Sequence, residues 1–463
     1  MSSVCGMNTI RYKGKKKYAV KLRTIDSSIF EDKFLNETEM ENQLDDHVNI
    51  VRYKKHHIDS TVQERTLVFV TQLCNNEKLE NLLPTFSFKQ KKILLIQLCH
   101  GLKYIHDNQI AHRNLTPGNV LLSLDGKNIK IMDFGISKKF ALDEKKIITR
   151  STGFNGTLGW VASEMCSDNR SKGFEAWVKA DIYSLGLLIY YIFTDGKHPY
   201  EGDANDKHQG IKNKKPPDFS FIENSEKFHD RYLLIDILKA MLSHEPDARP
   251  GITQILQHCI TWDAVKKMSF IKDCHLYLEQ PRDEDRQKPK RKAKRQLEHN
   301  GTVKQRMAYI GKESIDNYSS DDSEEFVQFG RSGGAPKDND GPELTEEEEK
   351  ALERIHEITG GDWVELIKKM LEDPNSGNNK RPYENSFTDL VRYIRNTHEY
   401  FKDNTRKMKS KLGSRNEGMW NFIASNVPKF FIYLFNLMKN ELEEDDKKRY
   451  LQEKAKNCEL PQE

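Results

Sequence analysis

The sequence predicts an α+β protein with two ordered regions, and three observations support this fold class. Residues 1–262 alternate between strand-like and helix-like patterns, whereas residues 344–448 carry only helical apolar stripes. Between them, residues 281–343 change to runs of charge, glycine and proline. A chain of 463 residues is also too long for one ordinary hydrophobic core, so two or three domains are expected.

The N-terminal region contains two clear strand patterns and two clear helix patterns. Residues 17–22 (KYAVKL) and 66–71 (TLVFVT) are rich in the β-branched and aromatic residues of strands. Apolar residues recur with helical spacing over 88–106. Residues 179–194 are apolar on nearly every side, which predicts a buried helix with Asp181 at its start.

The C-terminal region is predicted to contain helices only. A capping box at Thr345 begins one helix, and Asp362-Trp363 opens the next. Two further helical stretches are expected at 387–401 and 419–442, the second with an apolar and aromatic stripe typical of a core. Residues 449–463 form a tail.

Residues 281–343 are predicted to be a disordered insertion. Their basic run, 288–295, and acidic run, 319–325, cannot bury enough apolar area to offset the entropy lost on ordering. The basic run is interpreted first as a solvated linker, and a nuclear-localisation signal or an RNA-binding arm are the alternatives. We therefore expect a cytoplasmic protein, with a nuclear location possible through Lys288–Arg295.

Composition narrows the possible functions. Formal net charge is only +3, so any RNA-binding patch must be local. The best apolar run, 185–193, is far shorter than the roughly 20 residues of a membrane helix, so we expect no membrane insertion. The seven cysteines show no C-x-x-C pairing, which favours a reduced compartment over a disulfide framework or a zinc site.

Five short motifs occur in the order and context of a protein kinase. They are Tyr18-Ala-Val-Lys21, His112-Arg-Asn-Leu-Thr-Pro-Gly-Asn119, Asp133-Phe-Gly135, Ala162-Ser-Glu164 and Asp181, with Arg249 as the expected partner of Glu164. Any one of them could arise by chance, but together and in this order they are specific. Residues 1–262 therefore resemble a bilobal protein-kinase fold.

This resemblance implies a site for ATP or ADP with Mg²⁺. The predicted nucleotide-binding residues are Lys21, Glu37, Gln72, Cys74, Asn119 and Asp133, and the metal ligands among them are Asn119 and Asp133. Glu39 and Glu41 compete with Glu37 as partners of Lys21. The alternative is that Lys21, Glu37 and Asp133 form only a structural ion network.

Two features depart from the kinase pattern. Only Gly6 and Gly14 precede Lys21, so the Gly-rich phosphate loop is missing and the N-lobe is expected to be truncated at this loop. Asn114 replaces the aspartate that accepts the hydroxyl proton, and Thr116 replaces the lysine that follows it. Loss of a general base costs ~10²–10⁴ in rate. We expect a nucleotide-binding pseudokinase, with an active serine/threonine kinase as the alternative.

Other motifs carry a more specific resemblance. The sequence Gly156-Thr-Leu-Gly-Trp160 is similar to the inositol-requiring unfolded-protein-response sensors. Residues 383–396 (YENSFTDLVRYIRN) and 407–413 (KMKSKLG) are similar to the nuclease motif of ribonuclease L. Trp262, residues 268–278 and Asp362-Trp363 also match its kinase-extension nuclease (KEN) domain.

The chain thus resembles the kinase–endoribonuclease family of these proteins over nearly its whole length outside the insertion. By this resemblance, residues 263–280 are the first helix of an all-α KEN domain, and residues 344–448 are the remainder. The family implies a metal-independent endoribonuclease that cleaves single-stranded or looped RNA as a homodimer. Nucleotide in the kinase fold favours that dimer.

RNA cleavage by an internal 2′-hydroxyl needs a base, an acid and a phosphate contact. Tyr383, Arg395 and Asn396 match family positions; Arg395 can contact a phosphate and Asn396 is a neutral donor. The family's catalytic histidine falls at Tyr400, and His398 lies about 200° away around a helix. A phenol is a poor proton shuttle at neutral pH. We therefore expect a weakened ribonuclease, with a catalytically dead scaffold as the alternative.

Overall fold

The computed structural model describes residues 7–11, 17–24, 44, 47–59, 66–75, 77–134, 137–139, 156–166, 173–225, 228–278, 362–371, 382–383 and 386–441. Several predicted features lie outside the described residues: Gly6, Gly14, Glu37 with Glu39 and Glu41, Gly135, the side chain of Lys21, the insertion 281–343, the capping box at Thr345 and the tail 449–463. The chain divides into two compact units between Thr261 and Trp262.

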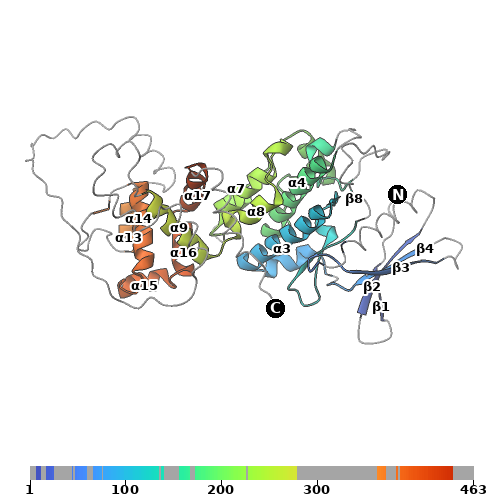
Figure 1. The fold of residues 1–463 in the computed structure, drawn as a ribbon, viewed down its shortest axis with the longest axis horizontal. Coiled ribbons are helices and arrows are strands. Elements are labelled where there is room, and N and C mark those ends of the chain that lie inside the picture. Colours follow the sequence, from blue (N-terminus) through green and yellow to red (C-terminus); the bar gives the residue numbers. More distant parts are fainter. Residues whose placement is uncertain are drawn as a thin grey trace, which may run out of the picture. The chain divides into compact units, whose positions relative to one another are not determined.

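A four-stranded antiparallel sheet forms the N-lobe of the first unit (Figure 1). Its strands are β1 (Met7–Arg11), β2 (Lys17–Thr24), β3 (Tyr53–Asp59) and β4 (Thr66–Gln72), in the order β1-β2-β4-β3. Both strand predictions are confirmed. Lys21 pairs with Phe69, so the predicted phosphate-pairing lysine lies in the middle of a central strand.

Helices make up most of the remaining part of the first unit. They are α2 (Leu79–Leu82), α3 (Phe88–Asp107), α4 (Phe174–Phe193), α5 (Ala204–Lys212), α6 (Ser220–Glu223), α7 (Arg231–Met241) and α8 (Ile252–Gln257). The short strands β6 (Val120–Leu122) and β7 (Ile129–Ile131) pair as a hairpin, and β5 (Ile110–Ala111) pairs with β8 (Lys138–Lys139). A capping box between Ser87 and Gln90 starts α3, which confirms the helix expected at 88–106.

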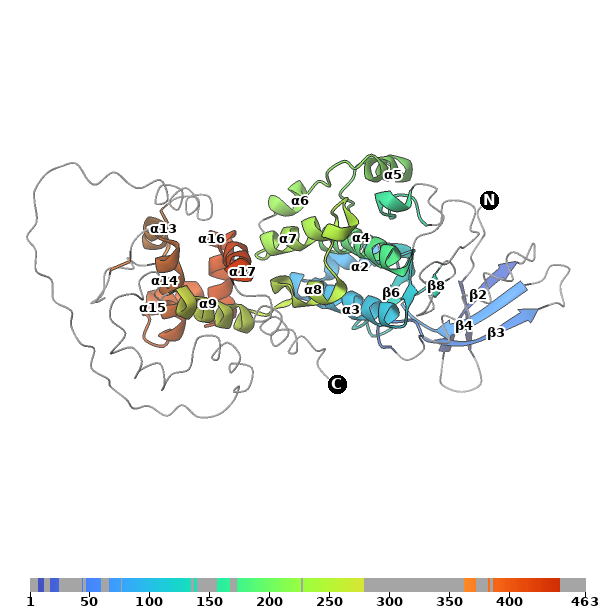
Figure 2. The ribbon, with the colours of Figure 1, turned by 45° about the horizontal axis from the view of Figure 1, so that its top comes forward.

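Helix α4 is the central core helix of this unit. Among the described residues, it alone is long and apolar enough to cross a membrane, and 78% of its most apolar stretch is buried within the protein. Figure 2 shows it beside α3, which it contacts along with α7. The helix begins at Phe174, so the expectation that Asp181 starts it was wrong. Its first two turns are only half-buried, and a search for an all-round apolar pattern misses them.

The second unit is all-helical within the described residues. Its helices are α9 (Ala264–Leu278), α13 (Trp363–Met370), α14 (Phe387–Glu399), α15 (Arg406–Leu412), α16 (Glu417–Asn426) and α17 (Phe430–Glu441). Trp262 contacts Phe270 of α9 and Phe431 and Phe435 of α17 edge-on, with ring centres 5.4–6.4 Å apart. A mixed unit and a helical unit together give the predicted α+β class.

The single helix expected over 419–442 is in fact two, α16 and α17. Pro428 lies between them. Proline has no N–H for the helical ladder, and its ring disfavours helical geometry in the preceding residue. Val427 accordingly has φ −133° and ψ 62°. The apolar stripe continues across this break, so periodicity alone predicts one continuous helix.

Candidate nucleotide and nuclease sites

One buried carboxylate holds the segment that corresponds to the kinase catalytic loop. Asp181 accepts the backbone N–H groups of His112 and Arg113, both at 2.8 Å, and lies 3.0 Å from Nε2 of His106. Arg113 has φ 68°, an unusual value for a residue with a Cβ, and its guanidinium lies 4.0 Å from the Trp177 ring centre. Such strain persists only where surrounding contacts enforce it, as these do.

His112 links this loop to the segment before Asp133. Its Nδ1 accepts the backbone N–H of Asn114 at 3.2 Å, so Nε2 carries the ring proton and donates to the Met132 carbonyl, also at 3.2 Å. Burial lowers the pKa of His112, and the nearby carboxylates of Asp181 and Asp133 oppose this only partly. A neutral imidazole therefore serves as a structural link here.

The kinase-base position is occupied by an amide that is already paired. The Thr157 hydroxyl donates to Oδ1 of Asn114 at 2.8 Å. The Asn114 carbonyl also accepts Nδ2 of Asn119 at 2.9 Å. Neither the side-chain Oδ1 nor the backbone carbonyl oxygen of Asn114 can remove a proton from a substrate hydroxyl, because an amide is not a base at neutral pH.

The structure brings the two predicted metal ligands onto neighbouring segments. The Met132 N–H donates to the Asn119 carbonyl at 3.0 Å, so Asp133 follows directly beside Asn119. Because Nδ2 of Asn119 binds Asn114, its Oδ1 is oriented away as an oxygen ligand. Asp133 has φ 71°, a second left-handed residue in the same site. An amide oxygen and a carboxylate fit Mg²⁺, which prefers hard oxygen ligands.

Gln72 and Cys74 lie at the end of β4, where the sheet meets the helical lobe. The Gln72 N–H donates to the Arg52 carbonyl at 2.8 Å, and the Asn75 N–H donates to the Leu122 carbonyl at 2.8 Å. Cys74 is buried between these two backbone hydrogen bonds, and burial raises the pKa of its thiol. Of the predicted nucleotide residues, only Glu37 and the side chain of Lys21 are not described.

The predicted pair of Glu164 and Arg249 is present and bidentate. Nη1 and Nη2 of Arg249 lie 2.5 and 2.9 Å from the two carboxylate oxygens of Glu164. Arg249 also donates to the carbonyls of Ser243 and Lys179, at 2.8 and 2.9 Å. Its side chain is fully buried, so this network fixes the segment after Trp160 to the helical core.

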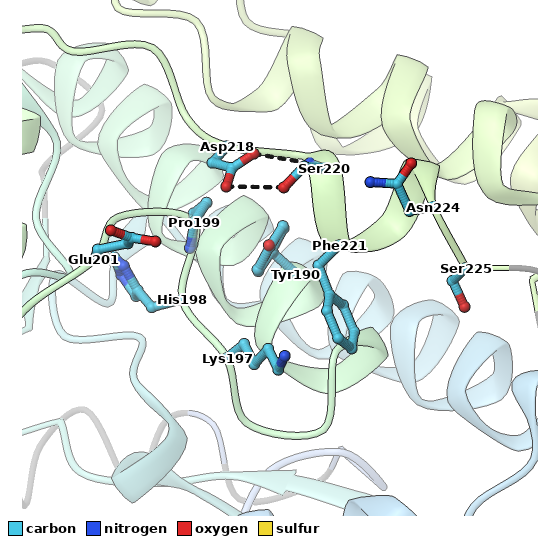
Figure 3. Close-up of a pocket in the computed structure, with 10 residues that line it drawn as sticks. All are labelled: Tyr190, Lys197, His198, Pro199, Glu201, Asp218, Ser220, Phe221, Asn224 and Ser225. Atoms are coloured by element: carbon cyan, nitrogen blue, oxygen red, sulfur yellow. Dashed lines mark hydrogen bonds between the residues drawn. The ribbon is translucent and has the colours of Figure 1, made fainter.

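A pocket of about 890 Å³ in the helical lobe is formed without any predicted site residue. Tyr190, Lys197 and Phe221 line it, and the Lys197 ammonium lies 3.6 Å from the centre of the Phe221 ring (Figure 3). Asp218 accepts the backbone N–H and hydroxyl of Ser220 at 2.8 and 3.0 Å, which fixes the start of α6. Lys197 and Asp218 therefore already interact with neighbouring residues of the pocket wall.

In the second unit, three of the five predicted nuclease residues form one hydrogen-bonded group. Nδ2 of Asn396 donates to the Tyr383 hydroxyl oxygen at 2.9 Å, and Nη1 of Arg395 donates to Oδ1 of Asn396 at 2.7 Å. Nε of Arg395 lies 2.7 Å from a carboxylate oxygen of Glu399, one turn later. This ion pair lacks hydrogen-bond alignment, and we regard it as charge neutralisation only.

Tyr383 is fixed by an aromatic and cationic surround. Its ring is edge-on to Tyr393 and Trp363, with centres 5.4 and 6.2 Å apart. The Arg392 guanidinium lies 4.5 Å from the ring centre and donates to the Pro382 carbonyl at 2.8 Å. Because this packing holds the phenol in place, the hydrogen bond from Asn396 meets a preorganised partner.

His398 and Tyr400 lie outside that group. Nε2 of His398 donates to Oδ1 of Asn416 at 2.7 Å, and burial lowers the pKa of the imidazole. Helix α14 continues regularly through Glu399, so the local backbone change that would bring His398 beside Asn396 is absent. Tyr400 is the C-cap residue of α14 and is 55% exposed.

Sequence reasoning missed several residues that complete these sites. Glu399 follows Arg395 by four residues, a spacing that could have identified the ion pair. Thr157 and Asn416 carried no such signal, because they lie 43 and 18 residues from the partners they contact.

Comparisons with known proteins agree with both predicted domains. Residues 2–260 match the protein kinase domain, and residues 337–452 match the ribonuclease 2-5A domain. The chain is 25% identical to the serine/threonine-protein kinase/endoribonuclease IRE1b of Arabidopsis thaliana, over 74% of this chain and 31% of that protein. It is 24% identical to the kinase/endoribonuclease IRE1 of Hypocrea jecorina, over 94% of this chain and 33% of that protein.

A third relative, the sensor for unfolded proteins in the ER ire1 of Schizosaccharomyces pombe, is 23% identical over 91% of this chain and 36% of its own length. The chain therefore spans about a third of the length of these relatives. With a kinase domain over more than half of its residues, the chain belongs to the protein kinase family, and with a ribonuclease 2-5A domain after it the chain is similar to the IRE1-type kinase/endoribonucleases.

Proposed function

We propose that this chain is a nucleotide-controlled endoribonuclease that cleaves single-stranded or looped RNA as a homodimer and without a catalytic metal ion. The observation that carries the proposal is the hydrogen-bonded group of Tyr383, Asn396 and Arg395 on and beside α14. It supplies a hydroxyl, an amide and a guanidinium within hydrogen-bond reach of one another. No metal is needed for the chemistry that such groups perform.

The reaction is an internal transfer at phosphorus. The ribose 2′-oxygen attacks the phosphorus and loses its proton, the bond to the 5′-oxygen breaks, and that oxygen gains a proton. The products are a 2′,3′-cyclic phosphate and a 5′-hydroxyl. Negative charge grows on the non-bridging phosphate oxygens, where a fixed cation stabilises the transition state most.

The geometry suggests roles for Arg395 and Asn396. Nη2 of Arg395 makes no hydrogen bond with the described residues, so it can contact a phosphate oxygen. Asn396 orients the Tyr383 hydroxyl and holds Arg395 at the same time. Asn396 is therefore the central positioning residue of the proposed site.

The kinase-fold domain is proposed to bind ATP or ADP with Mg²⁺ and so to favour the dimer. Asn119 and Asp133 would hold the ion, which neutralises phosphate charge when it is bound. The pairing of Asn114 with Thr157 supports a pseudokinase that binds nucleotide without transferring phosphate. We propose a cytoplasmic location, with nuclear entry through residues 288–295 as the alternative.

A catalytically dead scaffold is the second candidate, and a specific observation favours it. By the sequence resemblance, Tyr400 stands at the position of the family's histidine, and the imidazole of His398, two residues earlier, is bound to Asn416. Under this alternative the chain still binds nucleotide and RNA and still dimerises.

An RNA cleavage assay with analysis of product ends separates the two candidates. The nuclease should yield cyclic phosphate and 5′-hydroxyl ends, faster with Mg-ATP, and EDTA should not slow an enforced dimer. Asn396→Ala should remove the activity. Asn426→Ala is the matched control, because among the described residues that side chain bonds only to the Phe422 carbonyl of its own helix. If the enforced dimer leaves every RNA intact, the scaffold candidate replaces the nuclease.

A further inference from the structure

A cationic pocket lies at the end of the N-lobe sheet and shares Gln72 with the predicted nucleotide residues. Its volume is about 690 Å³, and residues from the sheet and from the β6–β7 hairpin line it. The lining residues are Tyr18, His47, Val48, Ile50, Arg52, Lys54, Gln72, Leu73, Leu124 and Lys130. Every charged residue among these described lining residues is a cation.

Lys130 is the central feature of this pocket. Its side chain lines the pocket although the residue is only 7% exposed, and no described residue pairs with its ammonium by hydrogen bond or ion pair. The Lys130 side chain is mostly enclosed while its ammonium reaches the pocket, so part of its hydration is lost, and an anion in the pocket would compensate for that loss. Residues of this kind are usually buried only beside an anion.

Within the described part of the chain, the surroundings of Lys130 do not supply that anion. Burial lowers its pKa, the Arg52 guanidinium lowers it further, and the nearby groups that oppose these effects are Cys74 and Asp125. Cys74 is a thiol whose own pKa burial raises. Asp125 is outside the pocket lining and already accepts the Ser123 hydroxyl and the backbone N–H of Lys127.

The pocket also offers a neutral donor. Nδ1 of His47 accepts the Asn49 N–H at 3.1 Å, which places the ring proton on Nε2. Burial and the positive charge of Lys130 keep the pKa of His47 low, so the ring stays neutral. Gln72 and Tyr18, which also line the pocket, carry an amide and a hydroxyl that can donate hydrogen bonds. Hydrogen-bond donors and cations therefore share one cavity.

We infer that this pocket binds a small soluble polyphosphate anion. Three cations line the pocket, Arg52, Lys54 and Lys130, and together they match a ligand with several charged oxygens. A planar guanidinium can donate two hydrogen bonds to one phosphate, and a lysine ammonium also binds phosphate. One carboxylate would occupy a small part of the volume and neutralise one cation. The inference goes beyond the proposed function, since Gln72 is the one predicted nucleotide residue in the described lining, and neither Asn119, Asp133 nor the nuclease group takes part.

Calorimetric titration of the full chain with inorganic pyrophosphate, in buffer with EDTA, tests this inference. Lys130→Met and Arg52→Gln should each weaken binding at least about tenfold, as expected for lost hydrogen bonds to a charged group. Lys55→Met is the matched control. Lys55 directly follows the pocket residue Lys54 on β3, and it does not line the pocket. It should leave the affinity within about twofold of wild type. Arg52 is exposed, so Arg52→Gln keeps the test valid if Lys130→Met misfolds.

Two parallel measurements distinguish this pocket from the nucleotide site and from a contact between copies of the chain. Mg-ADP binding should be the same in wild type, Arg52→Gln and Lys130→Met; equal loss of both ligands would mean that pyrophosphate occupies the nucleotide site. Sedimentation should show no change of mass in Arg52→Gln. A variant that changes the oligomeric state and not pyrophosphate affinity would show that the pocket is a contact between copies. Absence of binding at millimolar pyrophosphate would also overturn the inference.

Discussion

Replacing Tyr400 by histidine tests the proposed ribonuclease most directly. The Tyr400 N–H donates to the Asn396 carbonyl at 2.9 Å, so residue 400 follows Asn396 by one helical turn. That places it about 6 Å along the axis and about 40° around it. His398, about 200° around, faces Asn416 instead. An imidazole at position 400 would therefore lie on the same face as Asn396 and its partner Tyr383.

The size of the effect follows from exposure and from proton-transfer chemistry. Tyr400 is 55% exposed, so Tyr400→His should change the free energy of unfolding by at most about 0.5 kcal/mol. An imidazole so exposed keeps an ordinary pKa of about 6.5, suited to proton transfer near neutral pH. The gain in rate should be ~10²-fold or more, equivalent to about 2.7 kcal/mol of transition-state stabilisation.

The assay is single-turnover RNA cleavage by an enforced dimer across a range of pH. Tyr400→His should raise the rate, and the rate should acquire an inflection near pH 6.5 that the wild type lacks. Asn396→Ala should remove activity in both backgrounds.

A matched pair of variants gives the refuting result. His398→Ala removes the imidazole together with its hydrogen bond, whereas Asn416→Ala removes only the hydrogen bond. If His398→Ala abolishes wild-type cleavage, Asn416→Ala retains it and Tyr400→His changes little, the imidazole of His398 does the work. The assignment of position 400 would then be wrong.

Three further predictions concern the kinase-fold domain. Mg-ATP at 100 times its dissociation constant should stabilise the domain by ~2.7 kcal/mol in thermal melts, and Asp133→Ala should lose this shift. Radiolabel transfer from ATP should be no greater than in Asp133→Ala, because Asn114 is no base; labelling that vanishes in that variant would prove an active kinase. Glu164→Gln should cost about 3–5 kcal/mol in denaturant unfolding by leaving the fully buried charge of Arg249 unpaired. The exposed Glu175→Gln is its control, and equal losses would contradict the reasoning.

Much of the fold could be predicted because its signals are local. Strands β2 and β4 and helices α3 and α14 begin and end near where sequence patterns place them, and α13 begins where Asp362-Trp363 predicts a helix start. Two errors, the start of α4 and the undivided helix over 419–442, came from following apolar periodicity past other local signals. Pro428 was visible in the sequence, and its effect on backbone geometry is itself local.

The sequence by itself determined the residue types available to each proposed site: an amide where the resemblance places the kinase base, a tyrosine where it places the nuclease histidine, and the side chains of Tyr383, Arg395 and Asn396. The motif context also identified the partnership of Glu164 and Arg249 across 85 residues. Only the tertiary structure decided which atoms meet. It paired Thr157 with Asn114, turned His398 toward Asn416, and left the Lys130 ammonium in a cationic pocket. The physical reason is that residue identity fixes chemical capacity, whereas burial and hydrogen bonding depend on distant segments that only packing of the whole chain brings together.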